Sequence, residues 1–137
     1  MYQRHHLAHV DALAIVAAIR AELDKQNRGA AIAVVDAQGE LLAFLRTDGC
    51  RLSSITVAIN KAFTAAREQK ESWEVGESSR RSNFPMTNLG DLRYNGWGGG
   101  VPVVYEAQVV GAVGVSGLTE EEDMVLARMG AAMSSKT

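Results

Sequence analysis

The chain has 137 residues, of which 47% are hydrophobic and 22% charged, and its net charge is -2. This balance is typical of a globular protein and excludes a disordered chain, while the slight negative charge argues against a nucleic-acid partner. The length predicts one domain over residues 1–137. We also expect a cytoplasmic protein without a membrane partner, because no signal-peptide pattern or membrane-spanning apolar run is present.

The first half of the chain predicts a helix, a hairpin and a second helix. Apolar residues recur at helical spacing over about residues 7–26. Two short apolar runs, residues 31–35 and 41–45, flank a turn that contains Gly39, which predicts two antiparallel strands. A second helical stripe then runs from a capping serine, Ser53 or Ser54, to about residue 69. The alanines on this stripe indicate that the helix lies close against a sheet.

The second half is less regular before it returns to clear patterns. Residues 70–93 predict a short helix at about 72–79 and then a loop, and such a long irregular segment is usually functional or an oligomer contact. A flexible glycine loop follows at residues 96–100. Strands are expected at residues 101–105, where Pro102 indicates an edge strand, and at 109–116, before a last helix at about 120–133. Hairpins without crossovers indicate an antiparallel sheet and an α+β fold.

The end of the last predicted strand is the most informative stretch. Residues 111–117 carry three glycines and deliver Ser116 and Gly117 to the start of a helix, which Thr119 and Glu122 open as a capping box. Backbone N–H groups at such a helix start can face an acidic or polar guest. The alternative is that the glycines only permit close packing between strand and helix.

Four blocks of the chain, in the same order, resemble the signature of the GlcG/HbpS-like (DUF336) proteins. They are Val34-Val35-Asp36 with Gly39 and residues 42–49; Ser54, Ala58, Lys61, Ala62, Thr64 and Ala65; Gly99-Gly100-Val101-Pro102; and residues 110–117 with Asp123 and Ala127. The resemblance implies a profilin-like fold, with a five-stranded antiparallel sheet and helices on both faces. A fifth strand is then expected near residues 92–95. It also implies a homo-oligomer, from dimer to octamer.

The same resemblance implies a role in binding a small molecule. Some members of the family bind haem, among them a secreted redox-sensing type and the C-terminal domain of a corrinoid adenosyltransferase type. We therefore expect a small-molecule binding protein that holds haem or a similar planar anionic ligand. Two alternatives stay open: an enzyme of small organic-acid catabolism that uses the same pocket, and a structural oligomer. A fold shared with a family does not by itself define the chemistry.

Three early histidines are the candidate haem ligands. Histidine is the commonest axial ligand of haem iron. His5 and His9 are four residues apart, so both can lie on one helical face, and His9 continues the apolar stripe by one step. The haem-binding relatives use an early histidine, which favours His9 or His5 as the iron ligand. The alternative is that His5, His6 and His9 are exposed at the start of a surface helix.

Charged residues near the second strand are candidates for binding an anion. Arg46 and Asp48 follow that strand two residues apart, and Lys61 lies on a mostly apolar helix. Arginine and lysine together suit a carboxylate or the haem propionates. The alternative is an internal salt bridge that ties the loop to the helix. A lysine with a lowered pKa can also act as a Schiff-base nucleophile.

The glycine-rich segments supply the remaining candidates. Trp97 is flanked by glycines and can stack on a flat ligand or plug a subunit contact. Gly99, Gly100, Ser116 and Gly117 complete the expected ligand-binding set, in a pocket between the first helix, residues 46–49 and residues 98–117. Cys50 is the one cysteine, so an internal disulfide is excluded, and nearby arginines could lower the pKa of its thiol. The spacing around Ser116 does not match that of a serine hydrolase.

Overall fold

The computed structural model describes residues 1–136. Its centre is a four-stranded antiparallel sheet in the order β2-β1-β4-β3. The strands are β1 (Ala31–Asp36), β2 (Leu41–Arg46), β3 (Gly100–Tyr105) and β4 (Gln108–Ser116). The helices are α1 (His9–Lys25), α2 (Ser54–Glu68), α3 (Ser72–Ser82), the 3-10 helix η1 (Met86–Leu89) and α4 (Glu120–Ser134). Among residues 1–136, no helix has the length and apolar character needed to cross a membrane.

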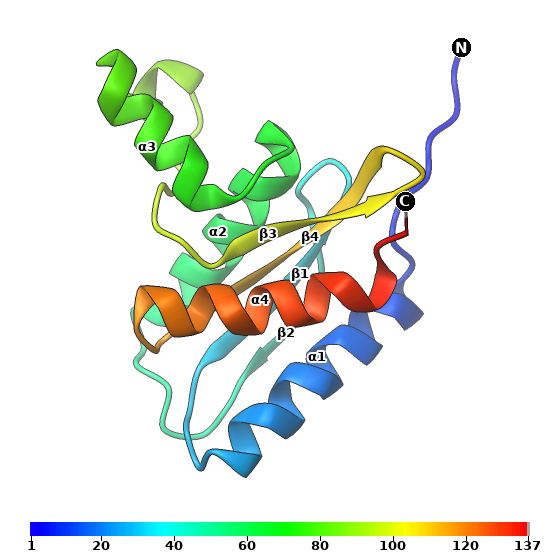
Figure 1. The fold of residues 1–137 in the computed structure, drawn as a ribbon, viewed down its shortest axis with the longest axis vertical. Coiled ribbons are helices and arrows are strands. Elements are labelled where there is room, and N and C mark those ends of the chain that lie inside the picture. Colours follow the sequence, from blue (N-terminus) through cyan, green and yellow to red (C-terminus); the bar gives the residue numbers. More distant parts are fainter. Residues whose placement is uncertain (137) are drawn as a thin grey trace.

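Helices cover both faces of the sheet because each strand sends alternate side chains to opposite sides. Helices α1 and α4 cover one face, where Ile32 and Val34 of β1 join their apolar core (Figure 1). Helix α2 covers the other face, where alanines dominate the contact, as their stripe predicted. The contact is so close that a Cβ on Gly114 of β4 would lie 2.1 Å from the carbonyl oxygen of Ala58.

The predicted α+β fold and both hairpins are confirmed, and β3 with Pro102 is an edge strand, as expected. The predicted fifth strand is wrong. Residues 92–95 form a turn and loop, in which the Arg93 N–H donates to Asp91 Oδ1 at 2.9 Å and the Asn95 N–H donates to Thr64 Oγ1 at 2.8 Å. The N–H groups of Arg93 and Asn95 therefore donate to side chains and do not pair with a neighbouring strand. The profilin-like description therefore stays a prediction.

Residues 70–93, which showed the least regular sequence pattern, form a helical excursion from the sheet. Helix α3 runs to Ser82, beyond the predicted end near residue 79, and projects away from the sheet before η1 and the chain return to β3 (Figure 1). Its base packs against α2 and the start of β3. The excursion therefore returns the glycine loop at residues 96–100 to the end of the sheet where β4 ends and α4 begins.

Candidate functional site

A cleft of about 740 Å³ opens where β4 ends and where α2 and α4 begin. Four of the predicted ligand-binding residues line it, namely Lys61, Trp97, Ser116 and Gly117. Gly99 and Gly100, two more of the set, are buried behind it against Lys61. The glycine-rich segments that the sequence singled out thus meet at one site.

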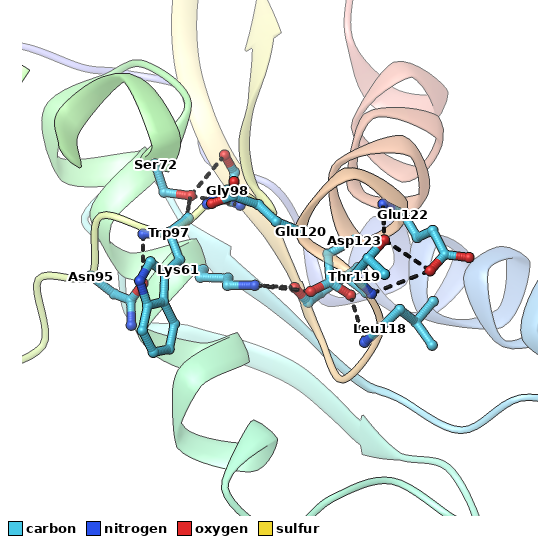
Figure 2. Close-up of polar contacts among 12 residues, drawn as sticks. Lys61, Ser72, Asn95, Trp97, Gly98, Leu118, Thr119, Glu120, Glu122 and Asp123 are labelled. Carbon is cyan, nitrogen blue, oxygen red and sulfur yellow. Dashed lines mark hydrogen bonds and ion pairs between the residues drawn. The ribbon is translucent and has the colours of Figure 1, made fainter. Parts of the chain in front are cut away.

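A buried ion pair forms the base of this cleft (Figure 2). Lys61 Nζ donates to Asp123 Oδ2 at 3.1 Å and to the Val115 carbonyl oxygen at 3.0 Å. The two side chains are only 3% and 4% exposed. The other carboxylate oxygen of Asp123 accepts from the Leu118 N–H at 3.1 Å. Each charged group therefore has protein partners in place of the water that it lost.

Burial shifts the pKa values of the two partners in opposite directions. It lowers the pKa of Lys61 and raises the pKa of Asp123, because both charged forms lose water on entering the interior. The charge and hydrogen bond of each partner oppose these changes. Since the Lys61 amine is held between a carboxylate and a carbonyl and is buried, the geometry favours a structural role over that of an exposed nucleophile.

The first turn of α4 holds Asp123 in position. The predicted capping box is confirmed, since the Glu122 N–H donates to Thr119 Oγ1 at 3.2 Å and the Thr119 N–H donates to Glu122 Oε1 at 3.3 Å (Figure 2). Arg28, just beyond α1, forms a two-contact ion pair with Glu122. The start of α4 is thereby fixed to the chain that leads into β1.

Glu122 should titrate at an unusually low pH. Hydrogen bonds from Arg28 and Thr119 lower its pKa to about 2 from 4.5. Because the folded-state pKa lies below the unfolded value, this contribution to stability is complete above about pH 4.5 and is lost as the pH falls toward 2. A carboxyl-detected NMR titration should show the Glu122 pKa rising toward 4.5 in Arg28→Ala.

The control for this titration is Arg20→Ala, which removes an α1 arginine that pairs with Asp24 instead. It should leave the Glu122 pKa unchanged. A Glu122 carboxyl that titrates near 4.5 in the unmodified protein would contradict the assigned ion pair.

The Trp97 loop was expected to be flexible, but its backbone is tethered. Ser72 Oγ donates to the Trp97 carbonyl oxygen at 2.6 Å and accepts from the Gly100 N–H at 2.8 Å (Figure 2). The Gly98 N–H donates to Glu120 Oε2 at 2.7 Å. The indole of Trp97 is nevertheless 62% exposed at the cleft. A fixed backbone therefore presents an open aromatic face.

Gly99 explains why this loop needs glycine. Its φ is +126°, and a Cβ there would lie 2.6 Å from the Val115 carbonyl oxygen and 2.9 Å from Lys61 Nζ. A side chain at this position would both strain the backbone and displace the ion pair. The glycine thus allows the loop to close over Lys61.

The three histidines lie at the other end of the sheet. His5 and His6 line a pocket of about 320 Å³ next to the start of β4, whereas Ser116 in the cleft is at the end of that strand. His9 is exposed, which agrees with the alternative of an exposed helix start and not with a side chain that continues the buried stripe. The apolar stripe of α1 begins to be buried only at Ala12, because His9 is the first residue of the helix and is not covered by the sheet.

Two of the histidine rings have defined surroundings. The His5 ring packs edge-on against Tyr105, with ring centroids 5.2 Å apart. His6 Nδ1 accepts a hydrogen bond from the Ala37 N–H at 3.3 Å. The pocket also includes Met133 of α4 and the buried Leu7. The pocket therefore has apolar walls. It also has one imidazole, that of His5, which makes no hydrogen bond to residues 1–136.

Arg46 and Asp48 do not join the cleft. Arg46 is exposed, and Asp48 lines a separate pocket of about 430 Å³ beside Arg28. The structure thus does not bring Arg46 and Lys61 together around one ligand, and the buried partner of Lys61 is Asp123 rather than Asp48. The expected single pocket between the first helix, residues 46–49 and residues 98–117 is divided into separate hollows.

Cys50 is half-buried, with a free thiol. Burial raises the pKa of this thiol, and the charge of Arg46 only partly opposes that change. The nearby arginines therefore do not lower the pKa overall, in agreement with a thiol that has no reactive role. A raised pKa does not favour a reactive thiolate.

Four charged residues of the cleft were not among the predicted site residues. Asp123 and Glu120 come from the start of α4, Arg51 from the loop before α2, and Arg80 from α3. For Asp123 a signal was present, since it lies on the buried stripe of α4 with Leu126 and Ala127. The two arginines lie in polar stretches with no distinguishing pattern.

With this geometry established, the class of the protein follows from its relatives. The model of the family described as "Haem degrading protein HbpS-like" matches residues 7–132, so the chain belongs to the HbpS-like family. Protein GlcG of Escherichia coli strain K12 is 41% identical over 108 residues, which are 77% of each chain.

Solved structures share the fold over nearly the whole chain. The Klebsiella pneumoniae protein ORFY is 30% identical with a TM-score of 0.90, and the match covers 96% of this chain and 92% of that one. The PduOC:Heme complex is 20% identical with a TM-score of 0.85, and the match covers 96% of this chain and 99% of that one. Because the PduOC protein is only 20% identical, this similarity shows a shared fold and nothing more.

Proposed function

We propose that the protein binds haem, or a similar planar anionic molecule, at the histidine pocket, with His5 as the iron ligand. The family description and the haem in the PduOC complex support a haem-related role. The observation that carries the proposal is the His5 imidazole, which lines the pocket without a hydrogen bond to any of residues 1–136. Neutral imidazole with a free ring nitrogen is the form that binds haem iron.

The other histidines fit the iron less well. His6 Nδ1 accepts a hydrogen bond from the Ala37 N–H. In the neutral ring the proton then lies on Nε2, so neither nitrogen of His6 has a free lone pair for iron. His9 does not line the pocket. Met133 does line it, and methionine with histidine is an established pair of haem ligands.

Arg4, which precedes His5 in the sequence, has one donor without a partner but does not line the pocket. Arg4 Nη2 donates to the Val109 carbonyl oxygen at 2.6 Å, but its Nε is buried and has no hydrogen-bond partner among residues 1–136. A buried donor without an acceptor is destabilising, but no contact between Arg4 and the pocket supports a role for it in binding. Within the pocket, His5 and Met133 are the residues that would hold haem, and the iron chemistry would come from the cofactor when it is bound.

The pocket is small for a whole haem. Its volume of about 320 Å³ is near the lower end of the range for ligand pockets, about 300–1,000 Å³. The ligand would therefore extend beyond it. The proposed homo-oligomer would supply a cover, and the exposed apolar side chains on the outer surfaces of α1 and α4 support self-association. They are Val10, Leu13, Val125, Met129 and Met133.

A haem titration followed by visible absorption tests this proposal. The unmodified protein and the matched variant His9→Ala should give a saturable shift of the Soret band, and His5→Ala should lose it. Sedimentation of the same samples measures self-association. If no sample saturates, haem is not the ligand; if His9→Ala alone loses the shift, the iron ligand is misassigned.

A further inference from the structure

Ser116, at the end of β4, lines the cleft at the other end of the sheet. The residue is only 6% exposed, and its hydroxyl, which has no hydrogen bond to residues 1–136, stays open to the cleft. Neighbouring polar groups are engaged: Lys61 and Asp123 with each other, and Glu120 with the Gly98 N–H. Because the Ser116 hydroxyl is open to the cleft, it can donate a hydrogen bond to a bound molecule or accept one from it.

Three cationic and two acidic side chains line the cleft, so its net charge is +1. Arg51 and Arg80 line it and are exposed, and among residues 1–136 Arg51 forms no ion pair, whereas Arg80 pairs with Glu77 outside the cleft. The positive end of the α2 dipole adds to this, because α2 begins at the cleft with Ser54. The Glu120 carboxylate also lines the cleft and accepts from the Gly98 N–H. With Lys61 and Asp123 neutralising each other, Arg51 is the cation that remains for an anionic ligand.

An exposed aromatic side chain in the lining favours a flat molecule. Trp97 lines the cleft, and Ser72 holds the backbone of its loop through two hydrogen bonds. An aromatic face on a tethered loop is suited to stacking on a planar group. The absence of histidine, cysteine and methionine from the lining separates this cleft from the proposed haem pocket.

We propose that this cleft binds a small planar carboxylate. The guanidinium of Arg51 and the hydroxyl of Ser116 hold its carboxylate, and the indole of Trp97 stacks on its planar part. This inference does not rest on the haem proposal, because the two sites share no lining residue. The sequence predicted that an arginine would bind the carboxylate of an organic acid. The structure supports that role for Arg51 in place of Arg46.

Benzoate is the probe, and the indole N–H of Trp97 is the reporter in a proton–nitrogen NMR titration. Benzoate should give a saturable shift. Cyclohexanecarboxylate, which has the same charge but no planar ring, and inorganic phosphate should each bind at least about fivefold more weakly, because they cannot stack. Equal binding of all three would overturn the planar selectivity, and no saturable benzoate binding would overturn the site.

Variants locate the contacts. Arg51→Gln should weaken benzoate binding by about tenfold or more, since it removes a charged hydrogen bond, and Ser116→Ala should also weaken binding. Arg81→Gln is the matched control, because this exposed arginine of α3 does not line the cleft. Arg51 is exposed, so its loss should leave the amide spectrum and the haem titration unchanged. Equal weakening in Arg81→Gln would overturn the assignment.

Discussion

Replacing Asp123 with alanine is expected to destabilise the protein by about 3–5 kcal/mol, because Lys61 would keep a buried charge with no partner. The two side chains are only 3% and 4% exposed, so little water reaches the Lys61 amine in place of the lost carboxylate. Urea unfolding followed by circular dichroism gives the free energy of unfolding, provided that the m-value stays constant.

Two controls separate the buried pair from a general effect of losing a carboxylate. Asp24→Ala breaks the exposed pair with Arg20 and should cost less than about 1 kcal/mol. The double variant Lys61→Met with Asp123→Leu removes both charges and should recover most of the loss, because apolar replacements of a buried pair are often neutral. A loss of under about 1 kcal/mol in Asp123→Ala would contradict the buried pair.

Replacing Gly114 with alanine is expected to cost about 3 kcal/mol or more, at the upper end for overpacking. The added Cβ would lie 2.1 Å from the Ala58 carbonyl oxygen and 2.8 Å from the Ala62 N atom, so the backbone of α2 must move away from β4. The melting temperature and urea unfolding measure the loss.

Gly49→Asn is the control for this substitution. Gly49 has a φ of +85°, a Cβ added there would meet no atom within 4 Å, and asparagine tolerates this backbone conformation. The control should cost less than about 1 kcal/mol. If Gly114→Ala were as stable as the unmodified protein, α2 would have to lie further from the sheet than the structure places it.

The secondary structure could be predicted because its signals are local. The turn with Gly39, the edge strand with Pro102 and the capping box of Thr119 with Glu122 each depend on a few neighbouring residues. The fifth strand came from the family resemblance rather than from a residue pattern. It failed because hydrogen bonds to Asp91 and Thr64 use the backbone donors of that segment.

The site was harder to predict because it depends on contacts between distant elements. Lys61 lies among alanines on the buried stripe of α2, and Asp123 lies on the buried stripe of α4. Each is a charge in an apolar pattern, so each needs a partner, but the sequence does not show that α2 and α4 meet at the end of β4. For His9, periodicity indicated a side of the helix but not where the sheet beneath it ends.

Two separate ligand sites at opposite ends of the sheet are the central proposal, and one NMR shift map tests it directly. Gallium protoporphyrin IX, a diamagnetic stand-in for haem, should shift signals of His5, Tyr105 and Met133. Benzoate should shift those of Trp97 and Ser116, with no overlap between the two sets. Porphyrin-induced shifts at Trp97 and Ser116, with none at His5, would contradict the two-site arrangement.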